Sequence, residues 1–180
     1  VAKQWLLLGG ETVLRRACRA LASCDVVDEV VAVVPAGDEA RAEADLRGLR
    51  LPVRAVPGGA ARADSVRAGL EALPGCVVVL VHDAARALVT AELGARVLDA
   101  ARASGAAVPA LPVGDTLVRD RAGEVGDEVQ RAGVHAVQTP QGFRRELLLE
   151  APRAADPAWV RSRRTKDTQR LHHRGRSFMS

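Results

Sequence analysis

An aspartate and an arginine, Asp83 and Arg86, stand directly after the apolar run Val77–Val81, with two small alanines between them. A guanidinium group suits phosphate recognition, and a carboxylate suits a sugar hydroxyl or a Mg²⁺ ion. Short β-branched runs are typical of strands buried on both faces of a parallel sheet, where ligands bind beyond the carboxyl ends of the strands. The sequence therefore predicts a ligand site at Asp83 and Arg86, although a salt bridge between the two would also explain the pair.

A second candidate site is the turn at Gly58 and Gly59, which follows an apolar run and precedes a helical pattern. Because glycine lacks a Cβ atom, backbone N–H groups in such a turn can approach a ligand closely. Asp64 and Ser65 stand where a helix begins, and a helix cap explains Asp64 better than ligand binding does. The glycine pair does not identify a ligand by itself, because such turns are common.

Thr139 is the third candidate. Pro140 fixes the turn that follows it and favours extended geometry at Thr139, so that the hydroxyl is presented beyond the end of a strand. A structural turn before a helix that begins near Arg144 also explains this run. Arg131 is by itself only an exposed arginine, and His82 is expected to bond locally because no second His or Cys stands at metal-ligand spacing.

The elements that must position these residues alternate along the chain. Helical patterns cover residues 14–21, 38–46, 64–73 and 93–101, and apolar β-branched runs cover residues 30–34, 53–56, 77–81 and 106–111. This alternation predicts an α/β sandwich with a mainly parallel sheet. Residues 112–135 break the pattern and are expected to form a projecting hairpin arm, with a long surface loop as the alternative.

In α/β nucleotide-binding folds a first strand and its glycine-rich turn precede the first helix. No such strand and turn stand before Lys3, so we expect the first strand to be missing from this chain. The sequence shows no apolar run long enough to span a membrane and no signal-peptide pattern, so we expect neither feature. The three cysteines show no metal-ligand spacing and their number is odd, so we expect a cytoplasmic protein with buried thiols.

The charge is unevenly distributed along the chain. Residues 161–180 carry seven Lys/Arg and one Asp, so residues 1–160 have a net charge of −2 although the whole chain has +4. We therefore expect one α/β domain over residues 1–160 and a basic tail over residues 161–180 that is too poor in apolar side chains to fold. A shifted reading frame would explain the composition of the tail.

Taken in order, these runs resemble the 2-C-methyl-D-erythritol 4-phosphate cytidylyltransferases of the non-mevalonate isoprenoid pathway. The resemblance extends from Lys3 to about Leu149. It rests on an ordered set of runs: Lys3-Gln4 with Leu8-Gly9-Gly10, Gly58-Gly59 with Arg62 to Val66, Val81 to Arg86, Asp115-Thr116, and Arg131 with Thr139-Pro140-Gln141.

The resemblance implies a Rossmann-like three-layer sandwich with a projecting β-arm. It also implies a reaction in which the phosphate of methylerythritol phosphate attacks the α-phosphorus of CTP and releases pyrophosphate, with Mg²⁺ carried by the triphosphate. Little covalent help is needed from the protein in such a reaction, because positioning and charge neutralisation supply most of the catalysis.

The roles that the resemblance implies fall on ten positions. Lys3 and Arg131 match catalytic residues of the family. The CTP-binding positions are Lys3, Gly58, Gly59, Ser65, Asp83 and Ala84. The positions that contact methylerythritol phosphate are Asp83, Arg86, Thr116, Arg131 and Thr139. Thr116 and Arg131 match residues of the family's arm, which reaches the partner subunit's site, so we expect a homodimer; no residue is expected to ligate a metal.

Two family features are absent from the sequence. The phosphate-cradling Ala-Ala-Gly-x-Gly-x-Arg loop is missing, and so is a lysine near the C-terminus. We therefore expect this chain to have little or no activity alone. Three other functions stay open: a ribitol 5-phosphate cytidylyltransferase, a non-catalytic remnant that only dimerises, and a nucleic-acid binder that acts through the tail, which the nearly neutral domain disfavours.

Overall fold

The computed structural model describes residues 2–150. The predictions for the basic tail at residues 161–180 lie outside this range. The elements are, in chain order, η1 (Lys3–Trp5), β1 (Leu7–Leu8), β2 (Glu11–Thr12), α1 (Val13–Ala22), β3 (Val30–Val34), α2 (Glu39–Leu46), β4 (Val53–Pro57), α3 (Arg62–Glu71), β5 (Val78–Val81), α4 (Ala91–Ser104), β6 (Ala106–Ala107), β7 (Ala110–Pro112), β8 (Leu117–Arg121), β9 (Glu124–Val129), β10 (His135–Val137), β11 (Gln141–Arg144) and α5 (Arg145–Glu150). None of the helices in this range is long and apolar enough to cross a membrane.

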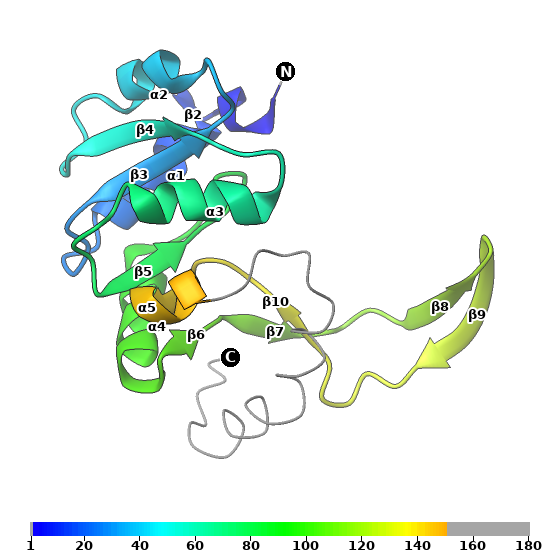
Figure 1. The fold of residues 1–180 in the computed structure, drawn as a ribbon. Helices are drawn as coiled ribbons and strands as arrows, with labels where there is room; N and C mark the ends of the chain where they lie inside the picture. The colour runs from blue at the N-terminus through cyan, green and yellow to red at the C-terminus, as the bar shows by residue number, and fades with distance from the viewer. Residues whose placement is uncertain (1, 151–180) are drawn as a thin grey trace.

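Two sheets form the body of the domain (Figure 1). β3 and β4 are parallel, whereas β11 lies between β5 and β6 and runs antiparallel to both. The pairing of the described strands therefore does not confirm a mainly parallel sheet. The physical reason is the route of the chain: β11 returns from the arm rather than from a crossover helix, so it enters its sheet in the opposite direction.

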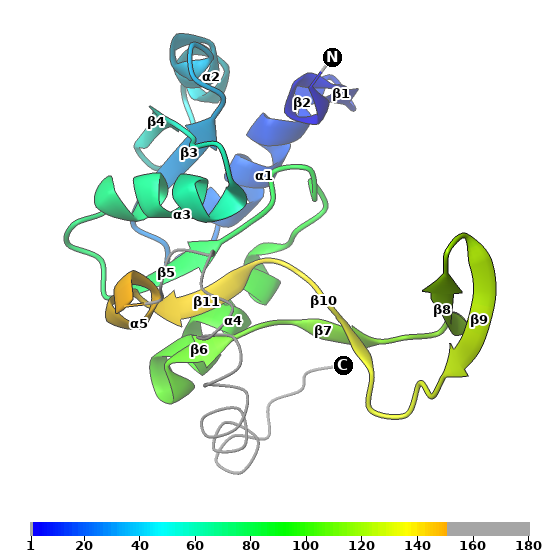
Figure 2. The ribbon, with the colours of Figure 1, turned by 45° about the vertical axis from the view of Figure 1, so that its right-hand side comes forward.

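The strands lie between two layers of helices. α3 packs against β3, β4 and α5 on one side, while α1 contacts β3, α2 and α4 on the other, and α4 covers β5, β6 and β11 (Figures 1 and 2). Apolar side chains of α1, β3 and α2 pack against Trp5 in one core cluster. α1 presents Leu14 and Cys18 to this core, as their helical spacing predicts.

The predicted strand at residues 106–111 is divided into two. β6 pairs with β11 inside the domain, whereas β7 pairs with β10 at the base of the arm. Pro109 stands between them and has no N–H group for either ladder, and its carbonyl accepts from Gln138 N at 2.8 Å. The chain therefore leaves the sheet at Pro109. Beyond it, β8 and β9 form an antiparallel hairpin that projects from the body (Figure 2).

The strand at residues 77–81 is less enclosed than predicted. β5 begins at Val78, only Val79 is buried, and Val77 is 78% exposed. β5 is hydrogen-bonded to β11 on one edge, and no described strand pairs with its other edge. An edge position explains why this apolar run is not buried on both faces.

Candidate functional site

Two arginine side chains lie close to the carboxylate of Asp83 in the turn after β5. Arg62 Nη2 lies 3.1 Å from Asp83 Oδ1, and Arg86 Nε lies 3.9 Å from Asp83 Oδ2. The Arg86 guanidinium also donates to the side-chain oxygen of Gln138. All three charged side chains are partly open to solvent, and exposed ion pairs contribute only about 0–1 kcal/mol. An incoming phosphate can therefore replace Asp83 as the partner of Arg86 at little cost.

The register of β5 and β11 brings Thr139 to this turn. Gln141 pairs with Val81 in the antiparallel ladder. Thr139, two residues before Gln141, therefore lies opposite Asp83, two residues after Val81. Thr139 Oγ1 accepts from the backbone N–H of Asp83 at 3.3 Å and lies 3.1 Å from Nδ1 of His82. Thr139 is the buried polar residue of the described chain, and the peptide bond to Pro140 is cis. Three predicted site residues, Asp83, Arg86 and Thr139, therefore share one place.

The turn at Gly58 and Gly59 packs tightly against the start of α3. A Cβ atom on Gly59 would lie 2.2 Å from Asp64 Cβ, and one on Gly58 would lie 2.8 Å from Ser65 Oγ. The Ser65 hydroxyl accepts from Gly59 N at 3.2 Å. Both glycines are therefore needed for close approach, and Ser65 holds the backbone of this turn.

Asp64 caps α3. Its Oδ2 atom accepts from the backbone N–H of Ala61 at 3.2 Å, which satisfies a donor at the beginning of the helix. The interpretation of Asp64 as a cap is confirmed. The residue that connects this helix to the strand-end turn is instead Arg62, through its ion pair with Asp83.

Sequence reasoning missed three residues of this cluster as site members: Arg62, His82 and Gln138. Arg62 is the first residue of α3, directly after the glycine turn, so its place at a helix start near a predicted ligand site was the available signal. The pattern carried no comparable signal for Gln138, whose role depends on the fold of β11. Six residues form the strand-end cluster: Arg62, His82, Asp83, Arg86, Gln138 and Thr139.

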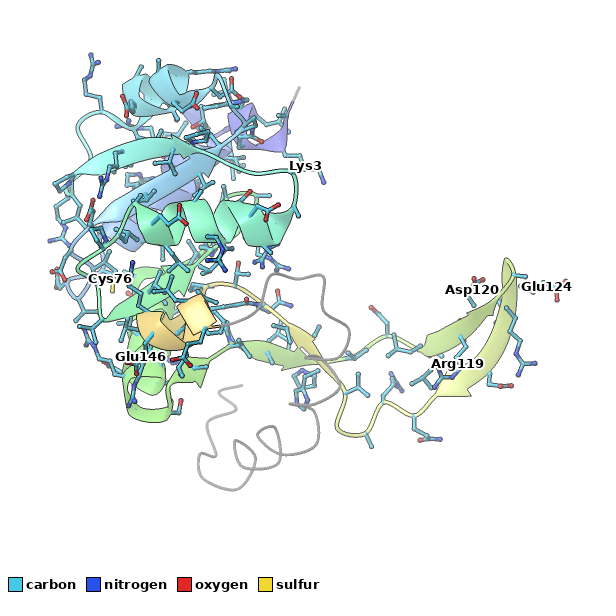
Figure 3. All side chains as sticks on the ribbon, in the orientation of Figure 1. Lys3, Cys76, Arg119, Asp120, Glu124 and Glu146 are labelled. Carbon is cyan, nitrogen blue, oxygen red and sulfur yellow. The ribbon has the colours of Figure 1, made fainter. Side chains whose placement is uncertain are left out.

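Three of the remaining predicted residues, Lys3, Thr116 and Arg131, lie apart from the strand-end cluster. Lys3 is exposed in η1, and Figure 3 shows its side chain pointing away from the ribbon; no side-chain hydrogen bond or ion pair links it to other described residues. Thr116 and Arg131 belong to the arm, where Arg131 donates to the backbone oxygen of Gly114. Ala84 is half-buried and packs against the core cluster. Ala84 directly follows Asp83, whereas the chain as described does not bring Lys3, Thr116 and Arg131 to Asp83.

Burial lowers the pKa of His82 below its ordinary value of 6.5. A hydrogen bond to the Arg86 carbonyl and the charge of Asp83 oppose this shift, and the charge of Arg86 adds to it. The imidazole is therefore held in its neutral form at neutral pH.

Two hollows open on the described surface. One of about 190 Å³ is lined in part by Arg62, Val81 and Gln141, so it borders the strand-end cluster. The other, about 630 Å³, is lined by residues 43 and 46–53 at the end of α2 and includes none of the cluster residues. No group of three or more His, Cys, Asp or Glu residues within residues 2–150 is arranged to hold a metal ion.

Residues 1–178 match the sequence profile of the family described as IspD: 2-C-methyl-D-erythritol 4-phosphate cytidylyltransferase. The chain belongs to this family. A bifunctional enzyme IspD/IspF of Anaeromyxobacter dehalogenans is 59% identical over 162 residues, which cover 88% of this chain and 42% of that protein. The 2-C-methyl-D-erythritol 4-phosphate cytidylyltransferase of Deinococcus radiodurans is 47% identical over 154 residues, 86% of this chain and 62% of that protein.

The fold of the IspD family is present as well. The crystal structure of 2-C-methyl-D-erythritol 4-phosphate cytidylyltransferase from Thermus thermophilus aligns with a TM-score of 0.70 and 39% identity, over 94% of this chain and 77% of that chain. This confirms the α/β nucleotidyltransferase fold and the resemblance found in the sequence. The chain spans about two fifths of the length of its bifunctional IspD/IspF relatives.

Proposed function

We propose that this chain forms the acceptor-binding part of a cytidylyltransferase. The complete protein transfers CMP from CTP to 2-C-methyl-D-erythritol 4-phosphate and releases pyrophosphate, in the synthesis of isoprenoid precursors. Family membership supports the reaction, because relatives that match most of this chain carry the name of that enzyme.

The observation that carries the proposal is the convergence of Asp83, Arg86 and Thr139 beyond the end of β5. Arg86 offers a planar donor to the acceptor phosphate, and Asp83 offers an acceptor to hydroxyl groups of the sugar alcohol. Arg62 on α3 keeps Asp83 paired when Arg86 turns to a phosphate. A phosphate and a polyol are thus bound by one cluster.

CTP binds next to this acceptor site in the proposal. The backbone of the Gly58–Gly59 turn borders the nucleotide, Ser65 holds this turn, and Asp83 and Ala84 border the cytidine side. The N–H groups of Gly58 and Gly59 donate to Val34 O and Ser65 Oγ, so the turn is held in one geometry. Lys3 supplies positive charge to the triphosphate, where it stabilises the transition state by charge neutralisation.

The metal in the proposal is a Mg²⁺ ion that arrives with the triphosphate of CTP. Mg²⁺ in such sites keeps several waters and is bound mainly by substrate phosphates. Asp83 is engaged by Arg62 and Arg86, so the described residues do not fit a magnesium ion held by the protein itself.

The arm is the proposed interface of a homodimer. It projects from the domain (Figure 2). It carries exposed apolar side chains that another subunit could cover, including Val118 at 47% and Val125 at 82% exposure. Thr116 and Arg131 lie on this arm, apart from the strand-end cluster of their own chain. In the proposed dimer they complete the partner's acceptor site.

A strand of the complete enzyme is proposed to lie between β3 and β5. Each of these strands is hydrogen-bonded on one edge, to β4 and to β11, and the two sheets are not hydrogen-bonded to each other. Backbone groups on open strand edges need partners, which a further strand would supply. Without that strand and its phosphate loop, we expect this chain alone to turn over CTP much more slowly than a full-length relative.

The proposed compartment is the cytoplasm. Cys18, Cys24 and Cys76 form no disulfide, which is the expected state of thiols in a reducing environment. Burial raises the pKa of Cys18 to about 12, so this thiol behaves as a core side chain and takes no part in the reaction.

Isothermal titration calorimetry of the full chain with methylerythritol phosphate tests the function. We expect binding that weakens about tenfold in Arg86→Gln, the scale of one lost charge-assisted hydrogen bond. Arg102→Gln, which removes an exposed arginine paired with Asp99 on α4, should bind like the wild type. Equal or tighter binding of ribitol 5-phosphate would support the ribitol alternative, and no binding of either compound would reject the proposal in favour of a non-catalytic remnant.

A further inference from the structure

His82 joins the two halves of the strand-end cluster, and the proposed function gives it no role. Its ring lies between the Thr139 hydroxyl, 3.1 Å from Nδ1, and the backbone oxygen of Arg86, 3.1 Å from Nε2. Thr139 comes from the segment before β11, whereas Arg86 comes from the turn after β5. One side chain therefore connects groups that are more than fifty residues apart in sequence.

The partners of His82 determine which of its nitrogens carries the proton. The Arg86 carbonyl can only accept, so Nε2 must donate to it. In the neutral ring Nδ1 is then an acceptor, and it receives the hydroxyl proton of Thr139. The Thr139 oxygen in turn accepts from the backbone N–H of Asp83. Each donor in this series has one acceptor, and the direction of every hydrogen bond is fixed.

We propose that neutral His82, with its proton on Nε2, is a positioning residue that orients the Thr139 hydroxyl and the Asp83–Arg86 turn for binding of the acceptor substrate. This inference rests on the proposed function. The residue acts through Thr139 and Arg86 and does not touch the substrate. Because the Thr139 hydroxyl donates its proton to Nδ1 of His82, a lone pair of Thr139 Oγ1 remains free to accept a hydrogen bond from a hydroxyl group of the substrate.

Protonation of His82 would reverse this arrangement. Nδ1 would become a donor, so the Thr139 oxygen would have to accept from both His82 and Asp83 N, and its own proton would turn elsewhere. The charged groups acting on the ring are Asp83 and Arg86 from its own turn, with Arg62 of α3 acting through Asp83; Thr139, on the β11 side, is uncharged. Burial lowers the pKa of His82 and so favours the neutral form that the hydrogen bonds require.

Substitution of His82 by each of two side-chain amides tests the two hydrogen bonds of the ring one at a time. In His82→Asn the side-chain oxygen stands near the place of Nδ1 and can accept from Thr139. In His82→Gln the amide nitrogen stands near the place of Nε2 and can donate to the Arg86 carbonyl. His82→Phe removes both bonds, and His135→Asn, on exposed β10, is the matched control.

The test combines nitrogen-15 NMR of the imidazoles with calorimetry of methylerythritol phosphate binding to the full chain. We expect the Nε2–H tautomer for His82, about tenfold weaker binding for His82→Phe, and binding within about threefold of wild type for His82→Asn, on the scale of single hydrogen bonds. Wild-type affinity should fall further on acidification than that of His82→Asn. The second pKa of the phosphate, about 6, contributes equally to both proteins.

Three results would overturn the inference: an Nδ1–H tautomer, a His82→Phe affinity equal to wild type, or the same pH profile in wild type and His82→Asn. If the Phe variant does not fold, the Asn and Gln variants and the wild-type tautomer decide the question. Failure of the wild type to bind methylerythritol phosphate rejects the proposed function and the inference with it. Normal binding by every His82 variant rejects the inference alone.

Discussion

The hydroxyl oxygen of Thr139 accepts a hydrogen bond from the backbone N–H of Asp83 at 3.3 Å, although 56 positions separate the two residues in the chain. The bond lies two residues beyond the end of the ladder between β5 and β11, where Gln141 pairs with Val81. It fixes the end of one strand against the segment that enters the other. The strand-end cluster thus depends on a long-range strand pairing.

Removing the Thr139 hydroxyl should weaken acceptor binding. In Thr139→Val the N–H of Asp83 loses its partner and the orientation of the turn is no longer fixed, so we expect about tenfold weaker binding of methylerythritol phosphate. Thr139→Ser keeps the hydroxyl and should stay within about threefold of wild type. Calorimetry measures both affinities, and equal affinities for the Val and Ser variants would contradict the role of the hydroxyl.

Gly59→Ala should destabilise the protein. The added Cβ atom would stand 2.2 Å from Asp64 Cβ, so α3 must shift from the β4 turn at a cost of about 1–3 kcal/mol in the free energy of unfolding. The matched control is Gly75→Ala, where no atom lies within 4 Å of the new methyl group, and a change within about 0.5 kcal/mol is expected. Urea unfolding measures both; equal effects would show that the glycine turn is not tightly packed.

The stability of the fold should depend on pH through His82. Burial lowers the pKa of this residue in the folded state, so the unfolded chain takes up the proton first as the pH falls below 6.5. The contribution of neutral His82 is complete above pH 6.5 and is lost as the pH falls toward the lower folded pKa. Wild type should therefore lose more stability than His82→Asn between about pH 7.5 and 5.5 in urea unfolding; parallel curves would contradict this.

Hydrogen exchange should distinguish the open strand edges from the paired ones. β3 and β5 are each paired on one edge, so amides that face the other edge should exchange rapidly, in alternation with protected ones. Gly142 and Phe143 of β11 have partners on both sides and should be protected. Uniform protection along β3 and β5 would show that another strand already covers these edges in solution. It would contradict the proposal that the position between β3 and β5 is open in this chain.

Local patterns in the sequence predicted most of the elements. The β-branched runs at β3 and β4 and the apolar stripe of α4 lie where their periodicity places them, because burial of such side chains depends on neighbours a few residues away. The insertion of β11 between β5 and β6 could not be predicted in this way. Its pairing depends on contacts across the whole arm, for which a single sequence carries no local signal.

The candidate site shows the same limit. Asp83 and Arg86 were singled out because they follow an apolar run, and Thr139 because Pro140 fixes the turn after it; the structure brings the three together. The partners Arg62 and Gln138 were missed, since their contacts depend on how α3 and β11 pack against β5. Residue types at strand ends thus predicted which side chains come together but not how they are held.

The most direct test of the central claim is backbone amide NMR of the full chain titrated with methylerythritol phosphate. We expect the largest shifts on residues 82–86 and on Gln138, Thr139 and Gln141, with smaller ones at Arg62 and the Gly58–Gly59 turn. Shifts confined to the hollow formed by residues 46–53, or no shifts at millimolar ligand, would contradict it.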